Sequence, residues 1–223
     1  QRQMCIRDSN LAEKIAMTVT EAPYRVTAET ISNTCGQTIS SSGVWNMMQR
    51  LGERIAEEEQ YAVKEMHADR VQGEKVIPVL FEEMDGIWLH MQNSNHRKMK
   101  KQEMKVFTMY EGWDKEQKKR SSLVEKTMRA GMESSQIFHE KREALIEKKY
   151  NADEIQQRIL NGDGGSWIRE TYDPDAIFQL DRYHIYQEIL RKISDRDAQR
   201  EARKLFEEEK ITEFLEFILV YAD

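Results

Sequence analysis

The stretch that decides the fold is residues 75–92, which read KVIPVLFEEMDGIWLHMQ. Side chains along a β-strand alternate between its two faces, so the odd-numbered positions of this stretch share one face. On that face, apolar residues at both ends enclose two carboxylates, Glu83 and Asp85. The even-numbered positions are largely apolar as well, which predicts a central strand covered on both faces.

A carboxylate on such a face needs a partner, because an unpaired buried charge costs several kcal/mol. We therefore expect Glu83 and Asp85 to meet a cation or a metal ion. The alternative is a strand that simply emerges into solvent near Glu82. The apolar pattern resumes after Gly86, which favours the covered strand.

Composition sets broad limits on the protein. Its 223 residues suffice for one domain and a small companion, and the longest apolar run is far shorter than a membrane helix. Two cysteines, Cys5 and Cys35, form neither a disulfide framework nor a zinc site, which predicts a reducing cytoplasm. The net charge of −6 argues against a generally basic surface, so nucleic-acid contacts would have to be local.

Pattern changes divide the chain into four segments. Residues 1–9, QRQMCIRDS, resemble a translated sequencing adapter and are predicted to be a non-native leader. Residues 10–70 are predicted to form a helical DNA-binding region, and residues 71–193 an α/β core. Residues 194–223 read as the start of a helical insertion, so we expect the chain to be a fragment.

The helical region has the order of a helix-turn-helix. A helix over residues 24–32 leads into a turn where Gly36 can adopt a left-handed conformation, and serines then offer N-caps to a helix over residues 44–58. The polar side chains expected to contact DNA are Thr38, Ser40, Ser41, Ser42, Asn46 and Arg50. The alternative is a plain helical hairpin that packs on the next domain.

The core is predicted to be a mixed sheet. Strands over residues 103–110 and 122–132 follow the first strand through short loops and form an antiparallel meander with it. After a helix over residues 134–150, a fourth strand ends in the glycine-rich residues 161–165, and a fifth covers residues 176–180.

Two basic loops separate the first three strands. Their cationic side chains are candidates to hold DNA phosphates, with ordinary solvated hairpin tips as the alternative. These side chains are Arg97, Lys98, Lys100 and Lys101 in the first loop, and Lys118, Lys119 and Arg120 in the second.

The carboxylates offer metal-dependent chemistry. If the fourth strand lies parallel beside the first, Asp85 and Asp163 approach each other and can bind Mg²⁺ or Mn²⁺, with Glu83 as a further candidate ligand. Alternatively, Asp163 is a turn residue among glycines. Asp181 is favoured as a helix N-cap, although with His184 it could instead border the site. The other histidines lack zinc-ligand spacing.

Several motifs resemble the transposases of the ISLre-two group of bacterial insertion sequences. The similarity covers about residues 24–193 and is carried by GQTISSSGVWNMMQRLGERI, FEEMDGIWLHMQ, KKQEMKVFTMYEGW, RILNGDGGSWI and FQLDRYHIYQEI. It implies a ribonuclease H-like core with three catalytic acids, of which Asp85 would be the first and Asp163 the second. The third, usually a glutamate, would follow the helical insertion and is expected beyond residue 223.

The resemblance implies a function and a set of partners. A complete enzyme would be a Mg²⁺-dependent transposase that cleaves and transfers DNA strands, binds double-stranded element ends and target, and assembles as a homo-oligomer. The present chain would be inactive, and its last residues would expose an apolar stripe of Phe214, Leu215, Ile218 and Leu219. The alternative is a DNA-binding regulator whose acidic α/β domain binds a partner or ligand. In that case, Asp85 and Asp163 would lie far apart.

Overall fold

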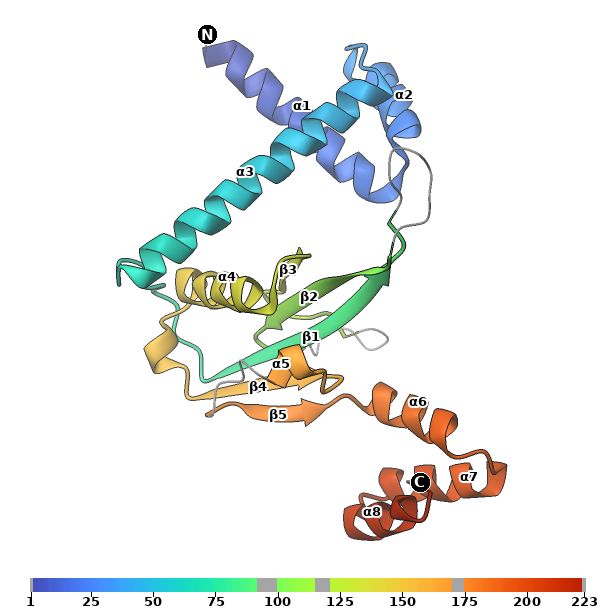
Figure 1. Ribbon diagram of the computed structural model, residues 1–223. Coiled ribbons are helices and arrows are strands. Elements are labelled where there is room, and N and C mark those ends of the chain that lie inside the picture. Colours follow the sequence, from blue (N-terminus) through green and yellow to red (C-terminus); the bar gives the residue numbers. More distant parts are fainter. Residues whose placement is uncertain (1, 92–99, 115–120, 170–174, 222–223) are drawn as a thin grey trace. The chain divides into compact units, whose positions relative to one another are not determined.

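The computed structural model describes residues 2–91, 100–114, 121–169 and 175–221, with side chains described from residue 10 onward. The chain divides into two compact units, Gln1–Arg70 and Val71–Asp223. The first unit is all helical and the second is built on a sheet (Figure 1).

Three helices form the first unit: α1 (Arg2–Glu21), α2 (Tyr24–Cys35) and α3 (Ser41–His67). They enclose a small apolar core of Ile15, Ala28, Ile31 and Val44. The backbone of α1 runs without interruption through the residues 2–9 that the sequence set apart.

The link between α2 and α3 shows why both helices end where they do. Gly36 caps α2 in the left-handed conformation, with φ +66°, as predicted. The Ser40 hydroxyl accepts a hydrogen bond from the Gly43 amide at 3.0 Å and caps α3. With this cap, α3 begins earlier than expected and continues beyond residue 58. Its Ile55 side chain is half exposed.

Five strands form the sheet of the second unit: β1 (Val79–Leu89), β2 (Gln102–Tyr110), β3 (Thr127–Gly131), β4 (Gln157–Gly162) and β5 (Ile177–Leu180). Their order is β3-β2-β1-β4-β5. β1, β2 and β3 pair antiparallel, whereas β1, β4 and β5 pair parallel (Figure 1). This mixed sheet confirms the predicted α/β fold class, although β3 is shorter than the predicted third strand.

Helix α4 (Ser135–Lys149) makes the crossover between β3 and β4, followed by the short 3₁₀ turn Ala152–Glu154. Together with α5 (Ser166–Arg169), it covers one face of the sheet. The buried core between them consists of Ile77, Leu80, Met84, Phe107, Met109, Phe138, Ile146, Tyr150, Leu160 and Ile168.

The two faces of β1 differ more in burial than the sequence indicated. The even-numbered Leu80, Glu82 and Met84 are buried, whereas Glu83 and Asp85 are exposed. The expectation that both faces are covered is therefore wrong in the middle of β1, where Glu83 and Asp85 reach solvent. The β1–β2 register is continuous from Phe81 to Leu89, so no bulge displaces Glu83.

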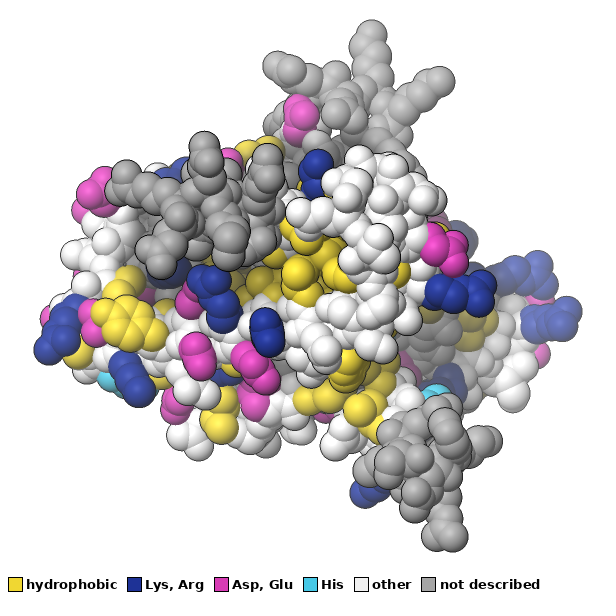
Figure 2. Space-filling view, turned by 90° about the horizontal axis from the view of Figure 1, so that it is seen from above, with side chains coloured by type: hydrophobic (Ala, Val, Ile, Leu, Met, Phe, Trp, Pro, Cys, Tyr) yellow, Lys and Arg dark blue, Asp and Glu magenta, His cyan; other side chains and the backbone are white. Residues whose placement is uncertain are grey.

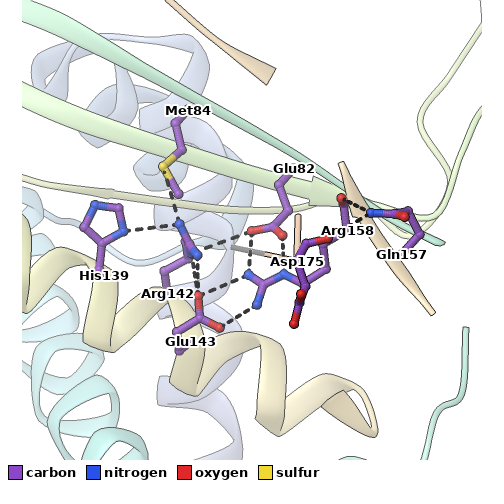
Figure 3. A network of polar contacts seen from close by, with 8 residues as sticks. All are labelled: Glu82, Met84, His139, Arg142, Glu143, Gln157, Arg158 and Asp175. Atoms are coloured by element: carbon purple, nitrogen blue, oxygen red, sulfur yellow. Dashed lines mark hydrogen bonds and ion pairs between the residues drawn. The ribbon is translucent and has the colours of Figure 1, made fainter. Parts of the chain in front are cut away.

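The buried carboxylate of β1 is Glu82, whose exposed fraction is 1%. Arg158 on β4 binds it with two hydrogen bonds, from Nε to Oε1 at 2.6 Å and from Nη2 to Oε2 at 3.0 Å. Arg142 on α4 adds an ion pair at 3.6 Å, and Glu143 accepts hydrogen bonds from both arginines (Figure 3). Two carboxylates thus meet two guanidinium groups.

Three further helices form a group with its own apolar core: α6 (Arg182–Lys192), α7 (Arg196–Glu207) and α8 (Ile211–Leu219). Phe214 on α8 is 7% exposed, and Ile218 packs against this core. Of the four residues in the expected apolar stripe, only Leu215 and Leu219 are exposed, so that prediction is half correct. No helix among the described residues is both long and apolar enough to cross a membrane.

Removing the charge of Glu82 tests the contribution of the ion-pair group. We expect Glu82→Gln to lower the free energy of unfolding by roughly 3–5 kcal/mol, because the buried Arg142 and the largely buried Arg158 would then share one carboxylate. Urea denaturation measures this loss. The matched control is Glu188→Gln, which removes an exposed pair with Arg191 and should cost less than about 1 kcal/mol. Equal costs would contradict the prediction.

Candidate functional site

A cleft of about 570 Å³ lies where β4 ends beside the middle of β1. Asp85 and Asp163 both line it, so the fold brings together the two acids on which the sequence prediction rests. The remaining lining residues are Glu83, Met84, Asn161, Gly162, Gln179, Leu180, Asp181, Arg182, His184, Ile185 and Phe206.

The strand register accounts for this arrangement. Met84 of β1 pairs in parallel with Gly162, the last residue of β4, so Asp85 and Asp163 are the residues that follow this pair. Neighbouring strands lie about 4.7–4.9 Å apart. Each acid is exposed and accepts a hydrogen bond from a nearby backbone amide: Asp85 Oδ1 accepts from the Gly86 amide, and Asp163 Oδ1 from the Gly165 amide, both at 2.8 Å. A carboxylate has lone pairs beyond one such bond.

Glu83 lies on the same face of β1 as Asp85, with one oxygen already engaged. The Tyr110 hydroxyl donates a hydrogen bond of 2.8 Å to Glu83 Oε1. Burial, followed by this hydrogen bond, raises the pKa of Tyr110, so the phenol remains the donor. Glu83 therefore has less freedom to turn toward a shared ion than Asp85.

Asp181 is both the N-cap of α6 and a residue that lines the cleft, the two roles considered for it from the sequence. Its Oδ1 accepts a hydrogen bond from the Tyr183 amide at 3.0 Å, which confirms the N-cap of α6. It also lines the cleft, and its Oδ2 lies 3.8 Å from His184 Nε2.

The donor set fits a hard cation held by few protein atoms. Among the described residues, no three His, Cys, Asp or Glu side chains are grouped so as to hold a metal ion. Mg²⁺ commonly binds through one or two carboxylates and keeps several waters or substrate phosphates. Asp85 and Asp163 meet that requirement, whereas a structural zinc site would need four nitrogen or sulfur ligands.

Residues 1–219 match a family described as the uncharacterised protein family UPF0236. The chain belongs to this family. The match spans both compact units and includes residues 1–9. No curated protein matches the chain.

The candidate DNA-contacting residues of this UPF0236 chain lie at the start of α3. Thr38 precedes the helix, Ser40 caps it, and the four other candidates follow within it. The side chains of all six are exposed. In the second unit, Lys100 and Lys101 are exposed before β2, whereas Arg97, Lys98 and the second basic loop lie outside the described residues.

Charge is unevenly distributed along α3. Residues 41–52 contain Arg50 and no acid, whereas residues 53–67 contain five glutamates. On the face seen in Figure 2, basic and acidic side chains are interspersed. The sequence reading missed one exposed side chain here, Trp45, whose ring centroid lies 5.9 Å from that of Tyr24.

The sequence reading also missed a buried histidine on α4. Arg142 Nη1 lies 3.2 Å from His139 Nδ1, and because a guanidinium only donates, Nδ1 must accept. The proton is therefore on Nε2, which donates to the Trp167 carbonyl at 2.9 Å. The available signal was the spacing of His139, Arg142 and Glu143, which places three polar side chains on one side of a helix.

This environment keeps His139 neutral. Burial is the main effect that lowers its pKa, and the charge of Arg142 adds to it, against the opposing hydrogen bond to Trp167. Protonation would place a proton on Nδ1, against the guanidinium. The histidine therefore stabilises the fold in its neutral form.

We predict a corresponding loss of stability in acid. Because the folded pKa lies below the ordinary value of about 6.5, the unfolded chain binds more protons there, and the free energy of unfolding falls as pH decreases below about 6.5. His139→Gln should make the decrease between about pH 7.5 and pH 5 smaller, as measured by urea denaturation. The control His67→Gln changes an exposed histidine. If both variants kept the wild-type slope, the prediction would be wrong.

Proposed function

We propose that this chain is a DNA transposase of the ISLre-two group of insertion sequences, with Asp85 and Asp163 as its metal-binding acids. One observation carries the proposal: Asp163 directly follows the end of β4, Asp85 directly follows its pairing partner on the parallel strand β1, and both line one cleft. The alternative of a regulator with two unrelated acids gives no reason for this juxtaposition.

The residues around the two acids suit a polyanionic substrate. Asp85 and Asp163 would hold Mg²⁺ or Mn²⁺, which would activate a water or 3′-hydroxyl and stabilise the leaving oxygen of a phosphodiester. The Asp163 loop continues with Gly164 and Gly165, which carry no side chains that could hinder an approaching DNA backbone. Gly164 has φ +80°, which favours glycine at that position.

The proposed reaction exchanges phosphodiester bonds without an external energy source. Water attacks phosphorus at the element end, the bond from phosphorus to the 3′-oxygen breaks, and that oxygen takes up a proton. The freed 3′-hydroxyl then attacks a target phosphodiester and displaces another 3′-oxygen. Both steps need metal coordination that two aspartates leave incomplete, so we expect this chain to bind metal ions but not to cleave DNA.

The first unit would supply DNA binding. The start of α3 combines exposed hydroxyl and amide groups with Arg50 and lacks carboxylates, which suits contacts to phosphates and base edges. In this proposal the partner is double-stranded DNA, and the acidic second half of α3 stays away from the phosphates.

Metal binding by the two aspartates tests the proposal. We expect Asp85→Asn and Asp163→Asn each to weaken Mn²⁺ binding tenfold or more, about 1.4 kcal/mol, because each removes one of two anionic ligands. Electron paramagnetic resonance of free Mn²⁺ measures the affinity. Asp153→Asn, which changes an exposed acid on the 3₁₀ turn, is the control. If all four proteins bound Mn²⁺ equally, while duplex DNA binding persisted, the regulator would be the better interpretation.

DNA binding by α3 gives a second test. Arg50→Ala should weaken binding to duplex DNA and reduce the slope of log affinity against log salt by about one, if the guanidinium contacts a phosphate. The control is Arg54→Ala one turn further, where the guanidinium lies 3.8 Å from Glu58. Fluorescence anisotropy at several salt concentrations measures both. Equal effects of the two substitutions would oppose a DNA-contacting role for the start of α3.

A further inference from the structure

The backbone pairing of β1 and β4 stops just before the two acids. The last parallel pair is Met84 with Gly162, and Asp163 follows in a segment with glycines on both sides. Ladder hydrogen bonds therefore do not fix the position of Asp163 relative to Asp85. Another contact has to do so if the two carboxylates are to share an ion.

Trp167 provides such a contact, because it anchors the Asp163 segment at two polar points. Its carbonyl accepts the hydrogen bond from His139 Nε2 at 2.9 Å, and its indole Nε1–H donates to Glu103 Oε1 at 3.1 Å. The ring packs edge-on against Phe138, with centroids 5.7 Å apart, and Lys105 Nζ lies 5.6 Å from its centroid. The next residue, Ile168, is fully buried in the core.

The second partner, Glu103, reaches the segment of the other acid. It belongs to β2 and pairs with Trp88 of β1. Its carboxylate lies against Gly86, where a Cβ atom would be only 2.2 Å from Glu103 Oε1. Gly86 directly follows Asp85 and donates its amide to the Asp85 carboxylate. The hydrogen bond from Trp167 to Glu103 thus joins the segments of the two acids.

We propose that Trp167 and Glu103 are a positioning pair that sets the separation of Asp85 and Asp163, with His139 holding Trp167 in place. This inference rests on the proposed metal site. Neither member of the pair touches the ion, and each acts through the backbone next to an aspartate. The hydrogen bond from Trp167 to Glu103 links the two segments beyond Met84 and Gly162, where β1 and β4 are no longer paired.

Matched substitutions separate this role from simple packing. Trp167→Phe keeps an aromatic ring against Phe138 and removes the indole N–H. Glu103→Gln keeps an oxygen that can accept from the indole and should behave like the wild type. Glu103→Ala removes the acceptor. The control Trp113→Phe makes the same chemical change at a half-exposed tryptophan that packs on Phe81 and Tyr110.

The experiment uses the whole chain and two readouts. Mn²⁺ affinity should fall about three- to tenfold in Trp167→Phe and in Glu103→Ala, the range expected for one hydrogen bond, and stay unchanged in Glu103→Gln and Trp113→Phe. Without metal, hydrogen exchange of the amides of residues 163–166 should become faster in the same two variants only. Thermal unfolding of each variant verifies that the fold is retained.

The outcomes are distinct for the pair and for the metal site. If the amides of residues 163–166 exchanged at the wild-type rate in Trp167→Phe, the proposed positioning pair would be overturned. So would faster exchange with unchanged Mn²⁺ affinity, provided that Asp163→Asn loses Mn²⁺. If Asp163→Asn binds Mn²⁺ like the wild type, the proposed metal site fails, and the metal-free exchange still decides whether the pair holds the loop.

Discussion

The sheet depends on neutralising one buried charge, the carboxylate of Glu82. It lies on the face of β1 that α4 covers, where solvent cannot compensate it. Arg158 reaches it from β4 and Arg142 from α4, so three elements are joined at one point. The crossover helix and the parallel strand it leads to are thereby fixed to β1. That parallel pairing brings the segments of both candidate acids next to each other.

The order of elements could be predicted from local patterns. Alternating apolar residues identified the strands, and turn residues such as Gly36 and Ser40 marked the end of one helix and the start of the next. Which acid of β1 is buried could not be predicted in this way. Alternation places Glu82 on one face and Glu83 with Asp85 on the other, but it does not say which face α4 covers. That choice depends on Arg142 and Arg158, which are distant in sequence.

Contacts between residues distant in sequence also explain other differences between the predicted and the observed structure. Phe214 was expected to be exposed because nothing after it could pack on it, yet its partners precede it on α6 and α7. Conversely, Asp163 was correctly placed beside Asp85 because a single crossover between parallel strands leaves little freedom. The contact between His139 and Trp167 could not be predicted, since a backbone carbonyl as partner leaves no trace in residue types.

The uneven charge of α3 has a consequence for how many base pairs it could read. The acid-free residues 41–52 span about 18 Å of helix axis at 1.5 Å per residue. Base pairs are stacked about 3.4 Å apart, so this part of α3 matches roughly five of them. The glutamates that follow would be repelled by the phosphates, so the helix would enter a groove end-on rather than along its length. In the proposed role, a single chain would recognise a short sequence, and a longer element end would need a second chain.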